Sequence, residues 1–107
     1  MPTYNKLVRD KIPQIIEQTG KEFHTRTLNE EEYIVELKKK LNEEISEYQN
    51  SRNNEEAMEE LADVLEVIHS LAKIHGESME VIEQKRKDKA TQKGGFISGI
   101  FLEHVED

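Results

Sequence analysis

The fold is decided by the stretch Asn29–Gly76, which reads NEEEYIVELKKKLNEEISEYQNSRNNEEAMEELADVLEVIHSLAKIHG. Apolar side chains recur in it every three or four residues, for example at Ile34, Leu37 and Leu41. That spacing is typical of an amphipathic α-helix. The polar run 50–54 interrupts the pattern once. The stretch therefore predicts two long helices, and a short connection favours an antiparallel arrangement of the two.

Both predicted helices carry signals at their ends. Asn29, followed three residues later by Glu32, matches a capping box and places the start of the first long helix. The second is expected to begin at Asn54 and to stop at Gly76, a residue suited to the position after a helix end. Apolar side chains cover much of the circumference of this second helix, which predicts that it is buried on two sides.

Shorter elements flank this pair. Pro13 and Gly20 bracket a short N-terminal helix. Ser78 can cap a further helix that ends near Lys93, before two glycines. The tail 96–107 is apolar but interrupted by glycine, so we expect an irregular segment packed on the helices. The predicted fold class is an all-α bundle of about four helices, forming a single domain over residues 1–107.

The composition bounds the possible functions. The chain has 107 residues, of which 35% are hydrophobic and 36% charged, and it has no cysteine. Disulfides, zinc–thiolate sites and thiol nucleophiles are thereby excluded. The sequence shows neither a signal peptide nor an apolar run of membrane-spanning length, so we expect a cytoplasmic protein without membrane contact. A chain of this size with so few hydrophobic residues has only marginal stability as a monomer. We therefore expect a homodimer or homotetramer.

The net charge of −8 is unevenly distributed along the chain. Residues 1–26 carry five basic and three acidic side chains (+2), and residues 29–66 carry four basic and thirteen acidic ones (−9). Residues 85–93 carry five basic and one acidic side chain (+4). The acidic middle argues against nucleic acid as a partner and suits a cation, whereas the basic flanks suit phosphate groups.

One acidic motif, EExxE at 43–47, lies in the first long helix. With a step of about 100° per residue, Glu44 falls inside the apolar face of that helix. Glu47 lies at the edge of the same face, and Glu43 lies further out. An ionised carboxylate in a packed face is unfavourable unless it is paired or coordinates a metal.

A second acidic motif, ExxD at 60–63, lies in the second long helix. Glu60 and Asp63 begin a stripe that continues with apolar residues, whereas Glu59 lies on the solvated face. The i,i+3 spacing places both carboxylates on one side of the helix. Two antiparallel helices can therefore face their carboxylate pairs across a bundle core.

Converging carboxylates repel one another, and a divalent cation relieves that repulsion. Ligation by oxygen atoms alone favours Mg²⁺, with Mn²⁺ as a possible substitute. We therefore expect a metal site built from Glu44, Glu47, Glu60 and Asp63. The competing interpretation is a solvated acidic helix with ordinary ion pairs, such as an i,i+4 pair between Glu36 and Lys40.

The two motifs resemble the EExxE…ExxD signature of the all-α nucleotide pyrophosphohydrolases, a superfamily that includes MazG, dimeric dUTPases and phosphoribosyl-ATP pyrophosphohydrolase. The opening YNKLVRDKIP at 4–13 and the later KGGF at 93–96 are similar to one small, stand-alone MazG-like branch. The resemblance covers nearly the whole chain. It implies a MazG-like bundle in which Glu44, Glu47, Glu60 and Asp63 bind the metal.

The resemblance also implies a reaction. It is the Mg²⁺-dependent hydrolysis of a nucleoside triphosphate, a modified or aberrant one in a house-cleaning role, to a monophosphate and pyrophosphate. Such a transfer needs positioning and charge neutralisation more than covalent chemistry. Glu43 or Glu47 would accept the proton of the attacking water.

Basic side chains would bind the substrate phosphates. Arg86 and Lys89 continue the apolar stripe of their helix, so we expect them to point inward; a solvated basic helix end is the equal alternative. Lys40 opens a stretch, KLNEE, that resembles K-x-G-E-E of phosphoribosyl-ATP pyrophosphohydrolases. The resemblance of the opening segment adds Lys6, Arg9 and Lys11.

Two alternative functions stay open. One is the phosphoribosyl-ATP pyrophosphohydrolase of histidine biosynthesis, from which the chain departs by having Asn42 in place of Gly and Val67 in place of His. The other is a non-catalytic acidic helical module that binds a nucleotide or a partner protein. An intact set of core-facing carboxylates argues against the second, because a protein without a cation to bind gains nothing from them.

Overall fold

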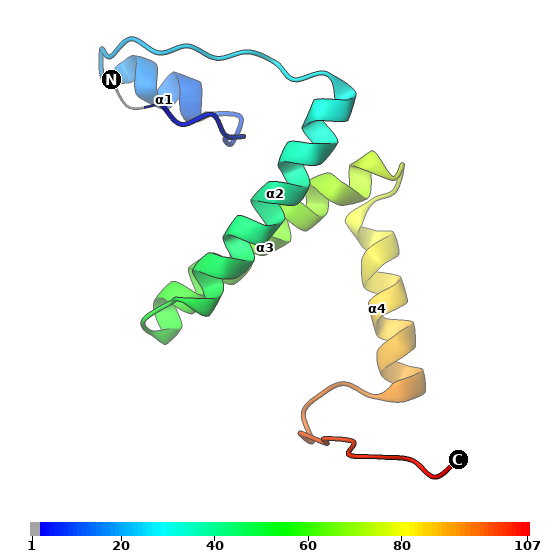
Figure 1. The fold of residues 1–107 in the computed structure, drawn as a ribbon. Coiled ribbons are helices and arrows are strands. Elements are labelled where there is room, and N and C mark those ends of the chain that lie inside the picture. Colours follow the sequence, from blue (N-terminus) through cyan, green and yellow to red (C-terminus); the bar gives the residue numbers. More distant parts are fainter. Residues whose placement is uncertain (1–2) are drawn as a thin grey trace.

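The computed structural model describes residues 3–107, and within that range it contains helices and no strand. Figure 1 shows their arrangement. In chain order the helices are α1 (Ile12–Gln18), α2 (Glu30–Gln49), α3 (Asn54–Ile74) and α4 (Met79–Lys93). The prediction of an all-α fold with about four helices is confirmed, and the predicted helix ends agree with these bounds to within two residues.

Side-chain caps define the N-terminal ends of the two long helices. The Asn29 side chain accepts a hydrogen bond of 2.9 Å from the backbone N–H of Glu32, and the Glu32 carboxylate accepts one of 3.4 Å from the N–H of Asn29. This reciprocal pair is the predicted capping box. At α3 the Asn53 side chain accepts a 2.8 Å hydrogen bond from the N–H of Glu56. Asn53 therefore caps the helix, which begins at Asn54 as predicted.

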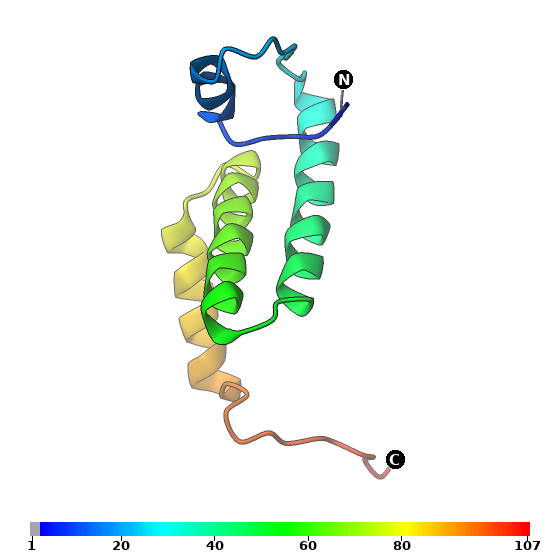
Figure 2. The same ribbon diagram turned by 90° about the vertical axis from the view of Figure 1, so that its left-hand side faces the viewer.

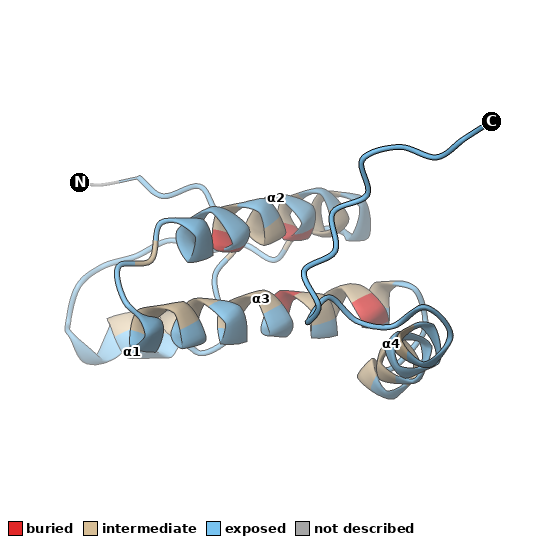
Figure 3. Ribbon diagram, turned by 90° about the horizontal axis from the view of Figure 1, so that it is seen from below, coloured by how far each residue is buried: buried red, intermediate tan, exposed pale blue. Residues whose placement is uncertain are grey.

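Helices α2 and α3 form an antiparallel hairpin, which Figure 2 shows from the side. Buried apolar residues of this hairpin are Leu37 on α2 and Val67 and Ala72 on α3. Glu44 on α2 is buried in the same way, as the red segments in Figure 3 show. The hairpin is therefore the element that brings the two acidic motifs together.

Helix α4 packs against α3 and, within residues 3–107, makes no packing contact with α2. Gly76 has φ 76°, a left-handed value that suits glycine, and it allows the sharp turn between α3 and α4. The resulting shape is extended, with principal extents of 62 × 35 × 26 Å and a radius of gyration of 18.5 Å. A compact domain of this length has a radius of gyration of about 13 Å.

The tail after α4 differs from its prediction. Its segment is irregular, as expected, but it extends away from the helices instead of packing on them (Figure 2). Phe96 is 99% exposed and Ile97 is 101% exposed, and Phe101 further along is 88% exposed. In the single chain, then, the apolar side chains of the tail are left uncovered.

The prediction that the second long helix is buried on two sides holds for one side only in the single chain. One side, with Val67, faces α2 and is buried. The other side carries Met58, Leu61 and Leu65, which remain 60%, 38% and 50% exposed. A separate property follows from the composition of the helices: none among the described residues combines the length and the apolar character that a membrane span requires.

Candidate metal centre

Three carboxylates from the hairpin meet at one point. Glu44 and Glu47 come from α2 and Glu60 comes from α3. One carboxylate oxygen of each lies within 4.8 Å of those of the other two. The i,i+3 spacing on α2 sets the first pair on one side of the helix, and the antiparallel packing of α3 brings the third carboxylate across to them.

Burial increases from the rim of this cluster towards its centre. Glu47 is exposed, Glu60 is half-buried, and Glu44 is only 7% exposed. Burial raises the pKa of Glu44 above its ordinary value, and the neighbouring charge of Glu47 raises it further. Glu44 is therefore an acidic group that the fold holds in an unfavourable environment for its ionised form.

Two oxygens of the cluster have no hydrogen-bond partner. These are Oε2 of Glu44 and Oε2 of Glu60, both buried. A buried polar atom without a partner is costly, and folded proteins rarely retain one without a reason. A divalent cation fits this donor set, because it would bind both orphaned oxygens and neutralise the repulsion among the three carboxylates.

Asp63, the fourth predicted ligand, stands apart from the three. Its Oδ1 accepts a hydrogen bond of 2.7 Å from Nη2 of Arg9, a residue 54 positions earlier in the chain. Its charge still contributes to raising the pKa of Glu44, so it lies near the cluster. The structure thus brings Asp63 to the site, but with an arginine as its partner.

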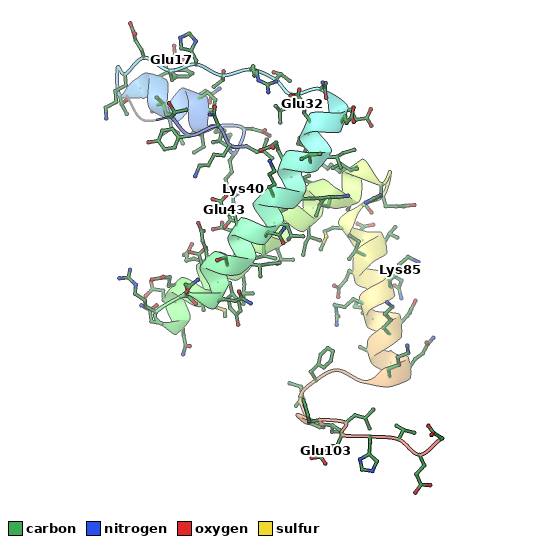
Figure 4. The ribbon with its side chains drawn as sticks, viewed as in Figure 1. Glu17, Glu32, Lys40, Glu43, Lys85 and Glu103 are labelled. Atoms are coloured by element: carbon green, nitrogen blue, oxygen red, sulfur yellow. The ribbon has the colours of Figure 1, made fainter. Side chains whose placement is uncertain are left out.

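Glu43 also lies beside the cluster and is surrounded by lysines. Its Oε1 is 3.4 Å from Nζ of Lys40 and 3.7 Å from Nζ of Lys6. Lys40 reaches Glu44 as well, at 3.5 Å, and Figure 4 shows Lys40 and Glu43 one helical turn apart on α2. Glu43 therefore contacts cationic side chains and is not one of the three converging carboxylates.

The predicted ion pair between Glu36 and Lys40 is not formed. Glu36 pairs instead with Lys39 at 3.1 Å, while the half-buried Lys40 points towards the acidic cluster. The physical reason is the concentration of negative charge around Glu44, which attracts the ammonium group more strongly than a single exposed carboxylate does.

The remaining predicted phosphate-binding residues lie elsewhere. Lys11 is exposed at the start of α1. Arg86 and Lys89 are exposed on α4, and Arg86 is paired within its own helix to Glu83 at 2.6 Å. The expectation that these two α4 residues point inward is wrong for the single chain, because α4 packs on α3 only through its first turns and leaves its basic end in solvent.

The site thus combines three carboxylates with a cationic rim made of Lys6, Arg9 and Lys40. Sequence periodicity found the carboxylates but gave no indication that Arg9 would bind Asp63. That contact joins an irregular N-terminal segment to a distant helix, and no local pattern encodes such a pairing. The sequence signals that pointed to Lys6 and Arg9 were the basic balance of the first 26 residues and the resemblance of the opening segment.

Comparison with known proteins adds one relative. The chain is 39% identical over 54 residues to an uncharacterized protein of Mycolicibacterium smegmatis, a match that covers 50% of this chain and 55% of that protein. The chain spans about half the length of the curated relative it matches. No family model and no solved structure matches the chain. The chemistry of the site therefore rests on its geometry and on the sequence motifs.

Proposed function

We propose that this protein is a divalent-metal-dependent hydrolase of nucleoside triphosphates that releases pyrophosphate. The observation that carries the proposal is the pair of orphaned carboxylate oxygens, Oε2 of Glu44 and Oε2 of Glu60, beside Glu47. Two carboxylate oxygens that are both buried and without a hydrogen-bond partner favour a cation-binding role over a solvated acidic face. The family resemblance of the motifs supplies the reaction.

The roles of the carboxylates follow from their positions. Glu44, Glu47 and Glu60 would hold Mg²⁺, and the resemblance adds Asp63 to this set. A bound Mg²⁺ would neutralise phosphate oxygens and lower the pKa of a water in its coordination sphere. Glu47 is exposed at the rim of the cluster, and it or Glu43 would accept the proton of the attacking water.

The cationic rim suits the anionic substrate. Lys6 and Arg9 extend from the N-terminal segment to the acidic cluster, and Lys40 joins them from α2. Each already contacts a carboxylate of the site, so each is within reach of an anionic group bound there. In the reaction, water would cleave the anhydride bond between the α- and β-phosphates, and a nucleoside monophosphate and pyrophosphate would leave.

The experiment that tests the proposal measures pyrophosphate release from a panel of common and modified nucleoside triphosphates. Phosphoribosyl-ATP is included, and every substrate is assayed with and without Mg²⁺. We expect metal-dependent release from one or a few members of the panel. No release from any substrate by the folded, metal-supplied protein would contradict the proposal and favour the binding-module alternative.

A matched pair of variants tests whether the activity belongs to this cluster. Glu60→Gln removes a half-buried carboxylate of the site, whereas Glu59→Gln removes its exposed neighbour on the same helix. Both substitutions change the net charge equally. We expect Glu60→Gln to abolish turnover and Glu59→Gln to leave it near the wild-type rate; equal effects would argue against the site.

A further inference from the structure

The last segment of the chain carries an unusual exposed apolar surface. We call residues 96–105 the C-terminal arm. Its large apolar side chains are 72% to 101% exposed, and they are Phe96, Ile97, Ile100, Phe101, Leu102 and Val105. Single exposed apolar residues are ordinary, but a contiguous group of this size marks an interaction site. Figures 1 and 2 show the arm leaving the end of α4 and extending away from the helices.

A second apolar surface lies on α3. Met58, Leu61 and Leu65 follow each other at i, i+3 and i+7, so they share one face of the helix, and we call them the outer stripe. The stripe continues into a shallow groove between α3 and α4, lined by Leu65, His69 and Met79 among others. The outer stripe is turned away from the carboxylate cluster, which lies on the side of α3 that packs on α2.

The exposed area of the chain is much larger than that of a compact monomer of the same mass. The accessible surface is 9995 Å², whereas a compact monomer of 12.5 kDa exposes about 6,200 Å². The excess, about 3,800 Å² per chain, is far more than the roughly 800 Å² that each partner contributes to a standard interface. Covering it on two chains would bury about 7,600 Å² in total, which exceeds the roughly 2,000–5,000 Å² typical of obligate homodimers, so an interface of that class needs only part of the excess.

The charge pattern also favours a second copy of this chain. Residues 85–93, which lead directly into the arm, carry five basic and one acidic side chain, a balance of +4. The segment 29–66, which forms α2 and most of α3, carries four basic and thirteen acidic ones, a balance of −9. An arm that reaches the hairpin of another copy would bring these opposite charges together, as complementary interfaces do.

We propose that the C-terminal arm of each chain packs on the outer stripe of a second copy, so that two chains exchange arms. The exchange covers the arm and the stripe at once, and it brings the basic end of α4 beside the partner's acidic hairpin. The proposal is independent of the catalytic function, because neither the arm nor the stripe includes a residue of the carboxylate cluster.

The first test is the mass of the full-length chain in solution at micromolar concentration, by sedimentation or light scattering. We expect a dimer or a multiple of it. Phe101→Ser on the arm and Leu65→Ser on the stripe should each weaken association about tenfold or more, because a few buried apolar anchors dominate interface energetics. A monomeric wild-type chain overturns the proposal.

A matched control separates loss of the interface from loss of the fold. Phe23→Ser removes the same type of side chain as Phe101→Ser, but from the segment between α1 and α2. It should leave association unchanged, and circular dichroism should show the same helix content for all the variants. If Phe101→Ser and Leu65→Ser associate as tightly as Phe23→Ser, then the arm and the stripe are not the interface.

Cross-linking distinguishes exchange between chains from folding back within one chain. The sequence has no cysteine, so Leu65→Cys and Phe101→Cys each introduce a single thiol. A short bismaleimide should join a mixture of these two single variants into a covalent dimer, and a mixture of Leu65→Cys with Phe23→Cys should give none. A link formed within one chain of the Leu65→Cys/Phe101→Cys double variant, with no link in the mixture, overturns the exchange.

Discussion

At the scale of single residues, Glu44 is a buried carboxylate in the apolar face of α2. A leucine at this position would continue the apolar face of α2, but the chain places there a carboxylate that is 7% exposed and has an orphaned oxygen. We expect Glu44→Gln or Asp63→Asn to reduce turnover to background, because both changes would remove charge from the proposed metal site. Pyrophosphate release measures the loss, and circular dichroism should show unchanged helix content. Wild-type activity in both variants would refute the ligand assignment.

The same residue predicts a pH dependence of stability in the metal-free protein. Burial and the nearby Glu47 raise the pKa of Glu44 in the folded state. The folded protein therefore binds this proton more tightly than the unfolded chain, and stability is lost as the pH rises from the ordinary pKa of 4.5 through the folded pKa. Each unit by which the pKa is raised corresponds to about 1.36 kcal/mol at neutral pH.

Glu44→Gln removes this titration. We therefore expect its free energy of unfolding, relative to that of the wild type, to increase as the pH rises above 4.5 in the presence of a chelator. Denaturant titrations at several pH values measure the difference. Glu59→Gln, at an exposed position, is the control and should show no such trend. A difference that is independent of pH would show that Glu44 is not held in an unfavourable environment.

The sequence predicted the positions of the carboxylates on their helices but not the contacts that their side chains make. The helical period alone placed Glu44 inside an apolar face and separated Glu60 from Glu59, because rotation around a helix is a local property. It could not predict that Arg9 would bind Asp63, because that contact spans 54 positions and begins in an irregular segment. Lys40 has three possible partners about one turn away on its own helix, Glu36, Glu43 and Glu44, and helical spacing alone does not decide among them.

At the scale of secondary-structure elements, the α2–α3 hairpin depends on its caps. Asn29 satisfies the N–H of Glu32, and Glu32 satisfies the N–H of Asn29 in return. Asn29→Ala removes the first of these bonds and should destabilise the protein by about 1 kcal/mol, which lowers the melting temperature by roughly 4–8 °C. Asn29→Ser keeps a cap acceptor and should cost far less. Thermal unfolding followed by circular dichroism compares the two, and equal effects would contradict the capping role.

The elements also show why helix ends were easier to predict than packing. Asn29 and Gly76 mark ends by chemistry that acts within a single turn. The position of the C-terminal arm has no such local determinant. Its apolar residues predicted that it would pack on the helices, and in the single chain it stays exposed. Likewise, Arg86 and Lys89 follow an apolar period that has no neighbouring helix to face.

At the scale of the whole molecule, the single chain has very little interior. Among the described residues, the buried apolar side chains are Leu37, Val67 and Ala72. Domains of this size are marginal even when compact, so contributions from outside the chain carry unusual weight. The two proposals would supply such contributions: a second copy would cover the apolar surfaces, and a cation would bind the carboxylates of the hairpin.

The cation should be visible as a change in global stability. A ligand that binds only the folded state stabilises it by about 2.7 kcal/mol at a concentration 100 times its Kd. Because Glu44 and Glu47 on α2 and Glu60 on α3 come together only when the hairpin forms, binding of a cation by these three carboxylates would be coupled to folding. We expect Mg²⁺ or Mn²⁺ to raise the melting temperature and a chelator to reverse the rise.

The variants locate this effect in the molecule. Glu60→Gln should abolish the rise in melting temperature on adding metal, while Glu59→Gln should retain it in full, because the two differ in burial and not in charge. Sodium chloride at matched ionic strength controls for screening of the −8 net charge, which by itself stabilises an acidic protein. If sodium chloride reproduces the whole effect of Mg²⁺, the stabilisation is screening and the carboxylates bind no specific cation. If Mg²⁺ acts at concentrations where sodium chloride does nothing, and only with Glu60 intact, the hairpin is a metal-binding element.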